Sequence, residues 1–95
     1  MNAARSRLAL AAHLLRTLAA AQRDGRRVDL DGLTRDIGVR RADVRATLSS
    51  LHAEGLVDVL RMRLTLDGFT LGQSLEGRRL APLRAAARAH VVAAA

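Results

Sequence analysis

The chain contains no cysteine and only one aromatic residue, Phe69, among its 95 residues. The absence of cysteine excludes disulfide bonds and metal sites built on thiolate ligands. The lack of aromatic rings argues against binding of single-stranded nucleic acid, because that mode depends on bases stacking on aromatic side chains. No apolar run approaches the length of a membrane span, so we expect no membrane partner.

Lysine is also absent, so every basic side chain that carries a fixed charge is an arginine. The 16 arginines outnumber the nine acidic residues and give the chain a formal net charge of +7. Such an excess in a small chain favours a polyanionic partner, because each phosphate that is neutralised releases counterions. The charge alone does not distinguish DNA from other polyanions.

The length and composition predict one domain over residues 1–95 with a thin, helix-rich core. Hydrophobic residues make up 49% of the chain, and most of them are alanine, leucine and valine. A core built from such small side chains is near the lower limit of what folds alone. Burial of further surface in a dimer would stabilise it.

Apolar spacing predicts a first helix over residues 3–23 that ends at the turn signal Asp24-Gly25. Its apolar stripe consists of Leu8, Ala11, Leu15 and Leu18. This stripe should pack on the two helices that we expect within residues 31–54. Leu10 and Leu14 lie beside this stripe. They either deepen the core or form one side of a subunit interface, and the sequence leaves both possibilities open.

Residues 31–54 have the pattern of two helices joined by a tight turn, with Asp31 as the predicted amino cap of the first helix. Leu33 and Ile37 lie four residues apart, as on the buried face of a short helix. Gly38 then supplies the left-handed backbone conformation that such a turn requires. The second helix would bury Val44, Leu48 and Leu51.

The opposite face of that second helix is narrow, basic and small-sided. It consists of Ala42, Arg45, Ala46, Ser49 and Ser50, with Arg40 and Arg41 at its amino end. A helix with this face can lie in the major groove of DNA, where arginine reaches guanine edges or phosphates and small residues permit close approach. The alternative is a helical hairpin whose polar face is merely solvated.

After Gly55 the apolar period changes from 3.6 to 2, which predicts a β-hairpin over residues 57–75. Asp67-Gly68 would form its turn, because this dipeptide between alternating apolar residues favours a type I′ hairpin. Arg61 and Arg63 would then project away from the helices. The alternative is that Thr65 caps a helix, which we disfavour because its glycines would each cost about 1 kcal/mol relative to alanine.

A last helix is predicted over about 78–92, with Pro82 in its first turn. Its alanine and valine stripe would suit a homodimer contact together with the first helix. Its arginines form either a second surface for anions or a solvated face, and we favour the solvated face.

Several of these residues together resemble the winged helix-turn-helix transcription regulators of bacteria, including the regulators of antibiotic resistance. The resemblance is carried by Leu33, Ile37-Gly38-Val39, Val44, Leu48, Leu51 and Gly55-Leu56-Val57. It implies a mostly α-helical domain with a small β-hairpin wing, which binds double-stranded DNA as a homodimer and acts as a repressor in the cytoplasm, associated with the nucleoid. The chain departs from the family at Arg40, where members usually place a Ser or Thr cap.

Within this interpretation, Arg41, Arg45 and Ser49 would read bases. Arg40, Arg61 and Arg63 would hold phosphates. We expect no catalytic residues, no metal and no cofactor, because the histidines are far apart in sequence and no nucleophile lies beside a recognisable base. The main alternative function is a protein-binding adaptor, which exposed Leu66 and Phe69 side chains would favour.

Overall fold

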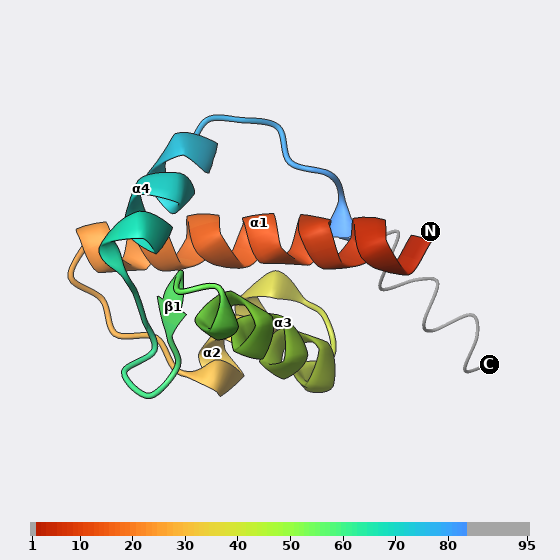
Figure 1. Ribbon diagram of the computed structural model, residues 1–95, viewed down its shortest axis with the longest axis horizontal. Coiled ribbons are helices and arrows are strands. Elements are labelled where there is room, and N and C mark those ends of the chain that lie inside the picture. The colour runs from red at the N-terminus through yellow and green to blue at the C-terminus, as the bar shows by residue number, and fades with distance from the viewer. Residues whose placement is uncertain (1, 84–95) are drawn as a thin grey trace.

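The computed structural model describes residues 2–83 of the chain. Its elements in chain order are α1 (Asn2–Arg23), α2 (Leu30–Ile37), α3 (Arg41–Ala53), β1 (Val57–Asp58), β2 (Arg63–Leu64) and α4 (Leu66–Leu75) (Figure 1). The strands pair antiparallel, with Val57 opposite Leu64 and Asp58 opposite Arg63. The predicted fold class is therefore confirmed in its coarse form, a mostly helical chain with one small two-stranded sheet.

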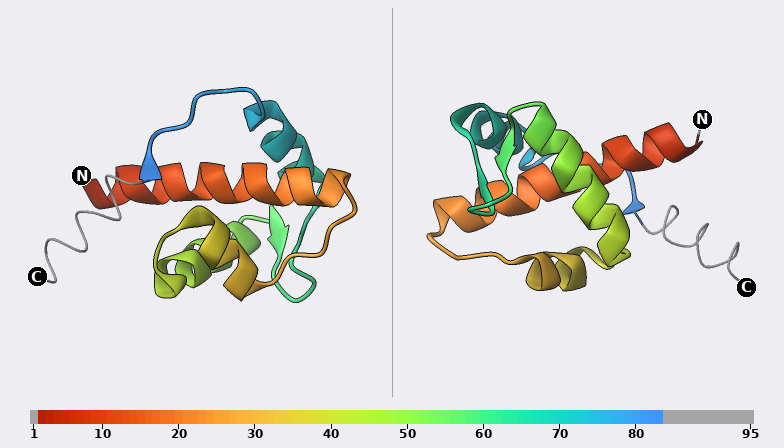
Figure 2. Two further views of the ribbon diagram at one scale, coloured as in Figure 1. Left: turned by 180° about the vertical axis from the view of Figure 1, so that it is seen from behind. Right: turned by 60° about the horizontal axis from the view of Figure 1, so that its bottom comes forward.

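Helix α1 passes through the middle of this part of the chain. Helices α2 and α3 and the hairpin lie on one side of it, and α4 lies on the other side (Figures 1 and 2). The core forms where these elements meet, and its largest fully buried side chains in the described residues are Leu14, Leu18, Leu33, Val44 and Val57. The helices predicted around 3–23 and 31–54 are present within one or two residues of their expected bounds.

The sequence did not decide whether Leu10 and Leu14 belong to the core or to a subunit interface. Both are buried in the core. They deepen the core and offer no subunit interface. Leu8, which was expected in the packed stripe, is 73% exposed, so that expectation is wrong. Leu8 lies on the same face of α1 as Leu15 and Ala19, which α4 contacts. Because α4 crosses only the carboxyl-terminal half of α1 (Figure 1), it does not cover Leu8.

The hairpin predicted over 57–75 is also wrong in its extent. The strands end at Leu64, the turn of the hairpin is 59–62, and Leu66–Leu75 forms α4. Thr65 caps this helix, since its Oγ1 accepts a hydrogen bond of 3.1 Å from the backbone N–H of Gly68. The disfavoured alternative is therefore the correct one, and Asp67-Gly68 lies in the first turn of a helix.

Close packing explains why glycine is present in α4 despite its low helix propensity. Gly68 and Gly72 are both buried. A methyl group on Gly68 would overlap the backbone carbonyl of Leu56, and one on Gly72 would lie 2.5 Å from the carbonyl oxygen of Leu15. These glycines let α4 approach the backbone of its neighbours, and the packing gained there offsets their propensity cost.

After α4 the chain turns at Gly77 and runs back along α1 (Figure 1). Residues 79–82 have no helical structure, so the predicted start of the last helix near 78 is wrong. The imidazole Nε2 of His13 lies 2.9 Å from the carbonyl oxygen of Ala81, and Leu83 is buried in the core. The remainder of the predicted last helix, 84–92, lies outside the described residues.

No helix within residues 2–83 is both long enough and apolar enough to cross a lipid bilayer.

Candidate nucleic-acid interface

The cap of helix α2 lies two residues before the predicted one. The cap is Asp29, whose Oδ1 accepts a hydrogen bond of 2.7 Å from the backbone N–H of Gly32. The prediction of Asp31 as the cap is therefore wrong, and Asp31 lies in the first turn of α2 with its carboxylate available to other groups.

The turn between α2 and α3 has the predicted geometry. Gly38 has a φ of 79°, in the left-handed region, and its N–H donates to the carbonyl of Thr34. Arg40 then precedes α3 in an extended conformation, and its side chain makes no cap hydrogen bond. Its carbonyl oxygen accepts from the N–H groups of Asp43 and Val44, both at 3.1 Å, so α3 begins at Arg41 without a hydroxyl cap.

Helix α3 separates its side chains into an apolar inner face and a polar outer face. The inner face buries Val44, Leu48 and Leu51, as predicted, and also Thr47, which the apolar pattern missed. The outer residues are all exposed and comprise Arg41, Ala42, Arg45, Ala46, Ser49 and Ser50. A basic, small-sided helix face is therefore open to solvent.

Some of the arginines proposed to contact DNA already pair with carboxylates. Arg40 Nε lies 3.1 Å from an oxygen of Asp43, and Arg41 Nε lies 3.0 Å from an oxygen of Asp31. Arg61 Nε lies 3.8 Å from Asp58. These contacts hold the guanidinium groups near the surface of α2, α3 and the hairpin.

Two other candidate arginines have no such partner in the part of the chain that the structure describes. Arg45 on α3 and Arg63 on β2 are exposed, and within residues 2–83 neither forms an ion pair or a side-chain hydrogen bond. Ser49, one turn after Arg45 on α3, is also exposed. The outer face of α3 and the hairpin thus offer guanidinium groups whose donors are open to a ligand.

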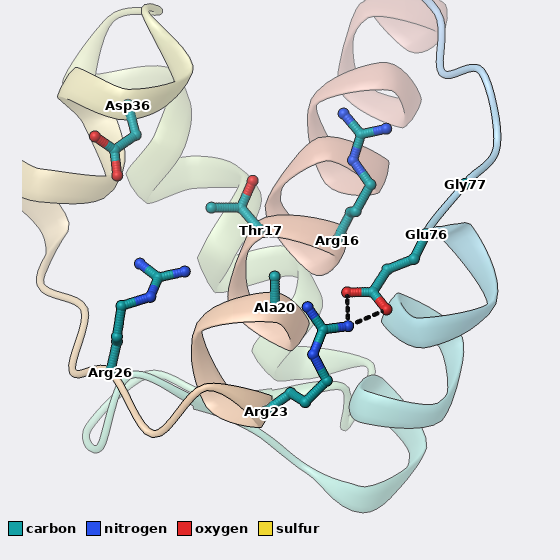
Figure 3. A pocket seen from close by; sticks show the side chains of 8 residues that line it. All are labelled: Arg16, Thr17, Ala20, Arg23, Arg26, Asp36, Glu76 and Gly77. Atoms are coloured by element: carbon teal, nitrogen blue, oxygen red, sulfur yellow. Dashed lines mark hydrogen bonds and ion pairs between the residues drawn. The ribbon is translucent and has the colours of Figure 1, made fainter.

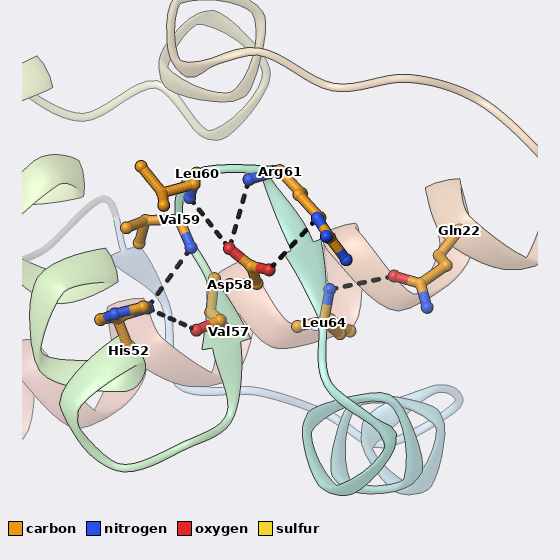
Figure 4. Close-up of polar contacts among 8 residues, drawn as sticks. All are labelled: Gln22, His52, Val57, Asp58, Val59, Leu60, Arg61 and Leu64. Atoms are coloured by element: carbon orange, nitrogen blue, oxygen red, sulfur yellow. Dashed lines mark hydrogen bonds and ion pairs between the residues drawn. The ribbon is translucent and has the colours of Figure 1, made fainter.

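Side-chain hydrogen bonds fix the hairpin to the helices on either side of it (Figure 4). Gln22 on α1 accepts a hydrogen bond of 3.0 Å from the backbone N–H of Leu64. His52 on α3 places its Nδ1 3.0 Å from the carbonyl oxygen of Val57. Asp58 accepts from the backbone N–H groups of Leu60 and Arg61, which organises the turn.

The hydrogen-bonding roles of Gln22, His52 and Asp58 were not predicted from the sequence. An acid two residues before an unpaired turn amide is the local signal that could have indicated Asp58. The contact of Gln22 joins residues 42 apart in sequence, and local patterns do not reveal such a pair.

The elements that carry the candidate arginines lie on the same side of α1. The first turns of α2 and α3 and the turn of the hairpin all lie on the side of α1 opposite α4 (Figures 1 and 2). Exposed candidate arginines therefore come from two parts of the chain on this side of α1, namely α3 with the residue before it, and the hairpin.

A separate shallow depression of about 550 Å³ lies between α1, α2 and the end of α4 (Figure 3). Its charged lining combines Arg16, Arg23 and Arg26 with Asp36 and Glu76. Arg23 donates to Glu76 at 2.6 Å, which neutralises part of this lining. Across residues 2–83, no three His, Asp or Glu side chains lie close enough together to hold a metal ion.

Comparison of the chain with models of protein families, with curated proteins and with solved structures finds no match.

Proposed function

We propose that this chain is a winged helix-turn-helix protein that binds double-stranded DNA with sequence preference and regulates transcription. In this proposal α2, residues 38–40 and α3 form the helix-turn-helix, and the hairpin over 57–64 is the wing. The observation that carries the proposal is the outer face of α3, which is basic, small-sided and open to solvent while the opposite face is buried.

Base reading is assigned to the middle of this face. The guanidinium group of Arg45, which has no partner among residues 2–83, can donate two hydrogen bonds to the edge of a guanine. Ala42 and Ala46 flank it with small side chains, so the backbone of α3 can come close to the base edges. Ser49 lies one turn further along and can donate to or accept from a base.

Phosphate contacts are assigned to the hairpin and to the residue that precedes α3. Arg63 is exposed and unpaired among the described residues, and Arg61 has only a long ion pair with Asp58. Arg40 precedes the amino end of α3, where the helix dipole also favours a phosphate, whereas Arg41 beside it is assigned to base reading with Arg45. The net charge of +7 adds long-range attraction to the duplex.

A homodimer that acts as a repressor in the bacterial cytoplasm, at the nucleoid, completes the proposal. Two copies of α3 about one duplex turn apart would require a near-palindromic site. A contact through α1 would cover Leu8, which is 73% exposed. The mass of the purified chain in solution, with and without a duplex, tests this part separately.

Selection of preferred duplexes from a random pool tests the proposed function. The expected result is a defined consensus that binds at least 10³-fold more tightly than a scrambled duplex, with affinity that falls steeply with salt. Recovery of no consensus, or loss of all duplex binding at moderate salt, would contradict the proposal.

A protein-binding adaptor is the second candidate, because two leucines beside the hairpin are open to solvent. Leu60 in the turn is 92% exposed and Leu66 at the start of α4 is 81% exposed, whereas Phe69 packs partly against the core. Apolar side chains in such positions suit a protein partner. An adaptor with incidental charge would elute early from heparin or from an immobilised duplex as salt rises.

A further inference from the structure

We propose that Asp31 is a specificity-determining residue that restrains Arg41 from binding DNA phosphates indiscriminately. This inference rests on the proposed function and concerns the free protein's own ion pair between α2 and α3. The carboxylate of Asp31 occupies the Nε side of the Arg41 guanidinium group, where a phosphate would otherwise bind, and a duplex must displace it to use that side.

The position of Asp31 follows from the capping of α2. Because Asp29 accepts the hydrogen bond from Gly32, the side chain of Asp31 has no capping role. It lies in the first turn of α2 and reaches the first residue of α3, where its Oδ1 is 3.0 Å from Arg41 Nε. The ion pair therefore joins the beginnings of the two helices that the proposed function brings to DNA.

The ion pair is open to competition from DNA. The side chains of Arg41 and Asp31 are 58% and 75% exposed, so solvent screens their attraction and the pair adds little to folding stability. A phosphate can replace the carboxylate, but Asp31 then remains close to the backbone of the DNA and repels it. Arg41 thus gains little from a phosphate alone.

The ion pair should affect binding to the preferred DNA site and binding to scrambled DNA differently. At a preferred site, a bidentate contact between Arg41 and a base can offset the loss of the ion pair with Asp31. Scrambled DNA does not supply this contact. Asp31 therefore weakens binding to scrambled DNA more than binding to the preferred site. Arg45 has no such restraint within the described part of the chain.

Asp36 provides a matched control for Asp31. Both are exposed aspartates on α2, so Asp31→Asn and Asp36→Asn change the net charge equally. Asp36 lines the depression beside α1 in Figure 3 and has no ion pair among residues 2–83. Melting temperatures of both variants would show that each retains its fold.

The test measures the affinity of the unaltered chain and both variants for a selected and a scrambled duplex at several salt concentrations. Asp31→Asn should raise the affinity for the scrambled duplex about threefold and increase its salt slope by about one, because Arg41 gains a phosphate. The selected duplex should gain less. Asp36→Asn should change both duplexes equally and by a smaller factor.

A double variant shows whether Asp31 acts through Arg41. In an Arg41→Ala background, Asp31→Asn should give no more than the gain of Asp36→Asn. An equal gain from the two asparagine variants, or a full gain without Arg41, would overturn the inference while duplex binding itself stands. Failure of the unaltered chain to bind either duplex would overturn the proposed function and the inference with it.

Discussion

The two sides of α1 are packed in different ways. On one side, α2 and α3 contact α1 through leucine and valine side chains, and their opposite faces remain polar and exposed. On the other side, α4 approaches α1 through Gly72, which lies against the backbone carbonyl of Leu15 and the methyl group of Ala19. The side-chain packing of α2 and α3 leaves their outer faces available for binding. The close approach of α4 at Gly72 leaves almost no space for a larger side chain.

Substitution of the buried glycines in α4 should have the largest effect on stability. A methyl group at Gly68 or Gly72 meets backbone atoms that are unable to move independently, so we expect Gly68→Ala and Gly72→Ala each to destabilise the fold by about 3 kcal/mol. Urea denaturation measures this free energy.

Gly32→Ala is the matched control, since its methyl group would meet no backbone atoms and only the carboxylate of Asp29, which caps α2, and the side chain of Arg35. It should change the free energy of unfolding by less than about 1 kcal/mol. Equal changes in the free energy of unfolding at Gly32 and Gly72 would show that close backbone packing by α4 does not distinguish the two sides of α1.

Removal of Arg45 should affect binding and leave stability unchanged. Its side chain is exposed and without a partner in the described residues, so Arg45→Ala should cost about 1 to 3 kcal/mol of binding to a selected duplex and relax the preference at one base position. Arg35→Ala on α2 removes the same charge and should weaken all duplexes slightly. Equal, unselective losses from both variants would remove Arg45 from base reading.

The sequence predicted the α2 to α3 region well because its signals are local. The spacing of Leu33, Val44 and Leu48 defines helix faces, and Gly38 marks the turn between them. The region after Gly55 was predicted wrongly because Asp67-Gly68 is also a local hairpin signal. The close approach of Gly68 to Leu56 and of Gly72 to Leu15 decided the outcome, and alternation along the chain does not reveal such contacts.

The candidate site shows the same division. Exposure of Arg45 and Ser49 followed from the helical period of α3. The ion pair between Asp31 and Arg41 depends on how two helices cross, and on a cap at Asp29 that is two residues from the predicted one. Local sequence patterns predict neither the crossing of the helices nor the position of this cap.

Loss of the α4 cap should have an intermediate effect on stability. Thr65 Oγ1 accepts from the N–H of Gly68 and donates to the carbonyl of Gly55 at 2.7 Å. Thr65→Ala should therefore destabilise the fold by about 1 to 2 kcal/mol in thermal or urea unfolding. Thr65→Ser keeps the hydroxyl and should retain most of the stability; a serine variant as unstable as the alanine variant would contradict the capping role.

The smallest expected effect is on phosphate binding by the hairpin. Arg63→Ala should weaken selected and scrambled duplexes alike by about threefold and lower the salt slope by about one. Arg61→Ala should weaken them less, because Arg61 is already paired with Asp58. A change of sequence preference on removing Arg63 would assign it to base reading instead.

The most direct test of the account is a titration of the isotopically labelled chain with a selected duplex, followed by backbone amide resonances. The account predicts that shifts concentrate on residues 40–50 and 58–63 and leave α4 and residues 76–83 nearly unchanged. Shifts centred on α4 or on the depression beside Arg23, with α3 unaffected, would contradict it.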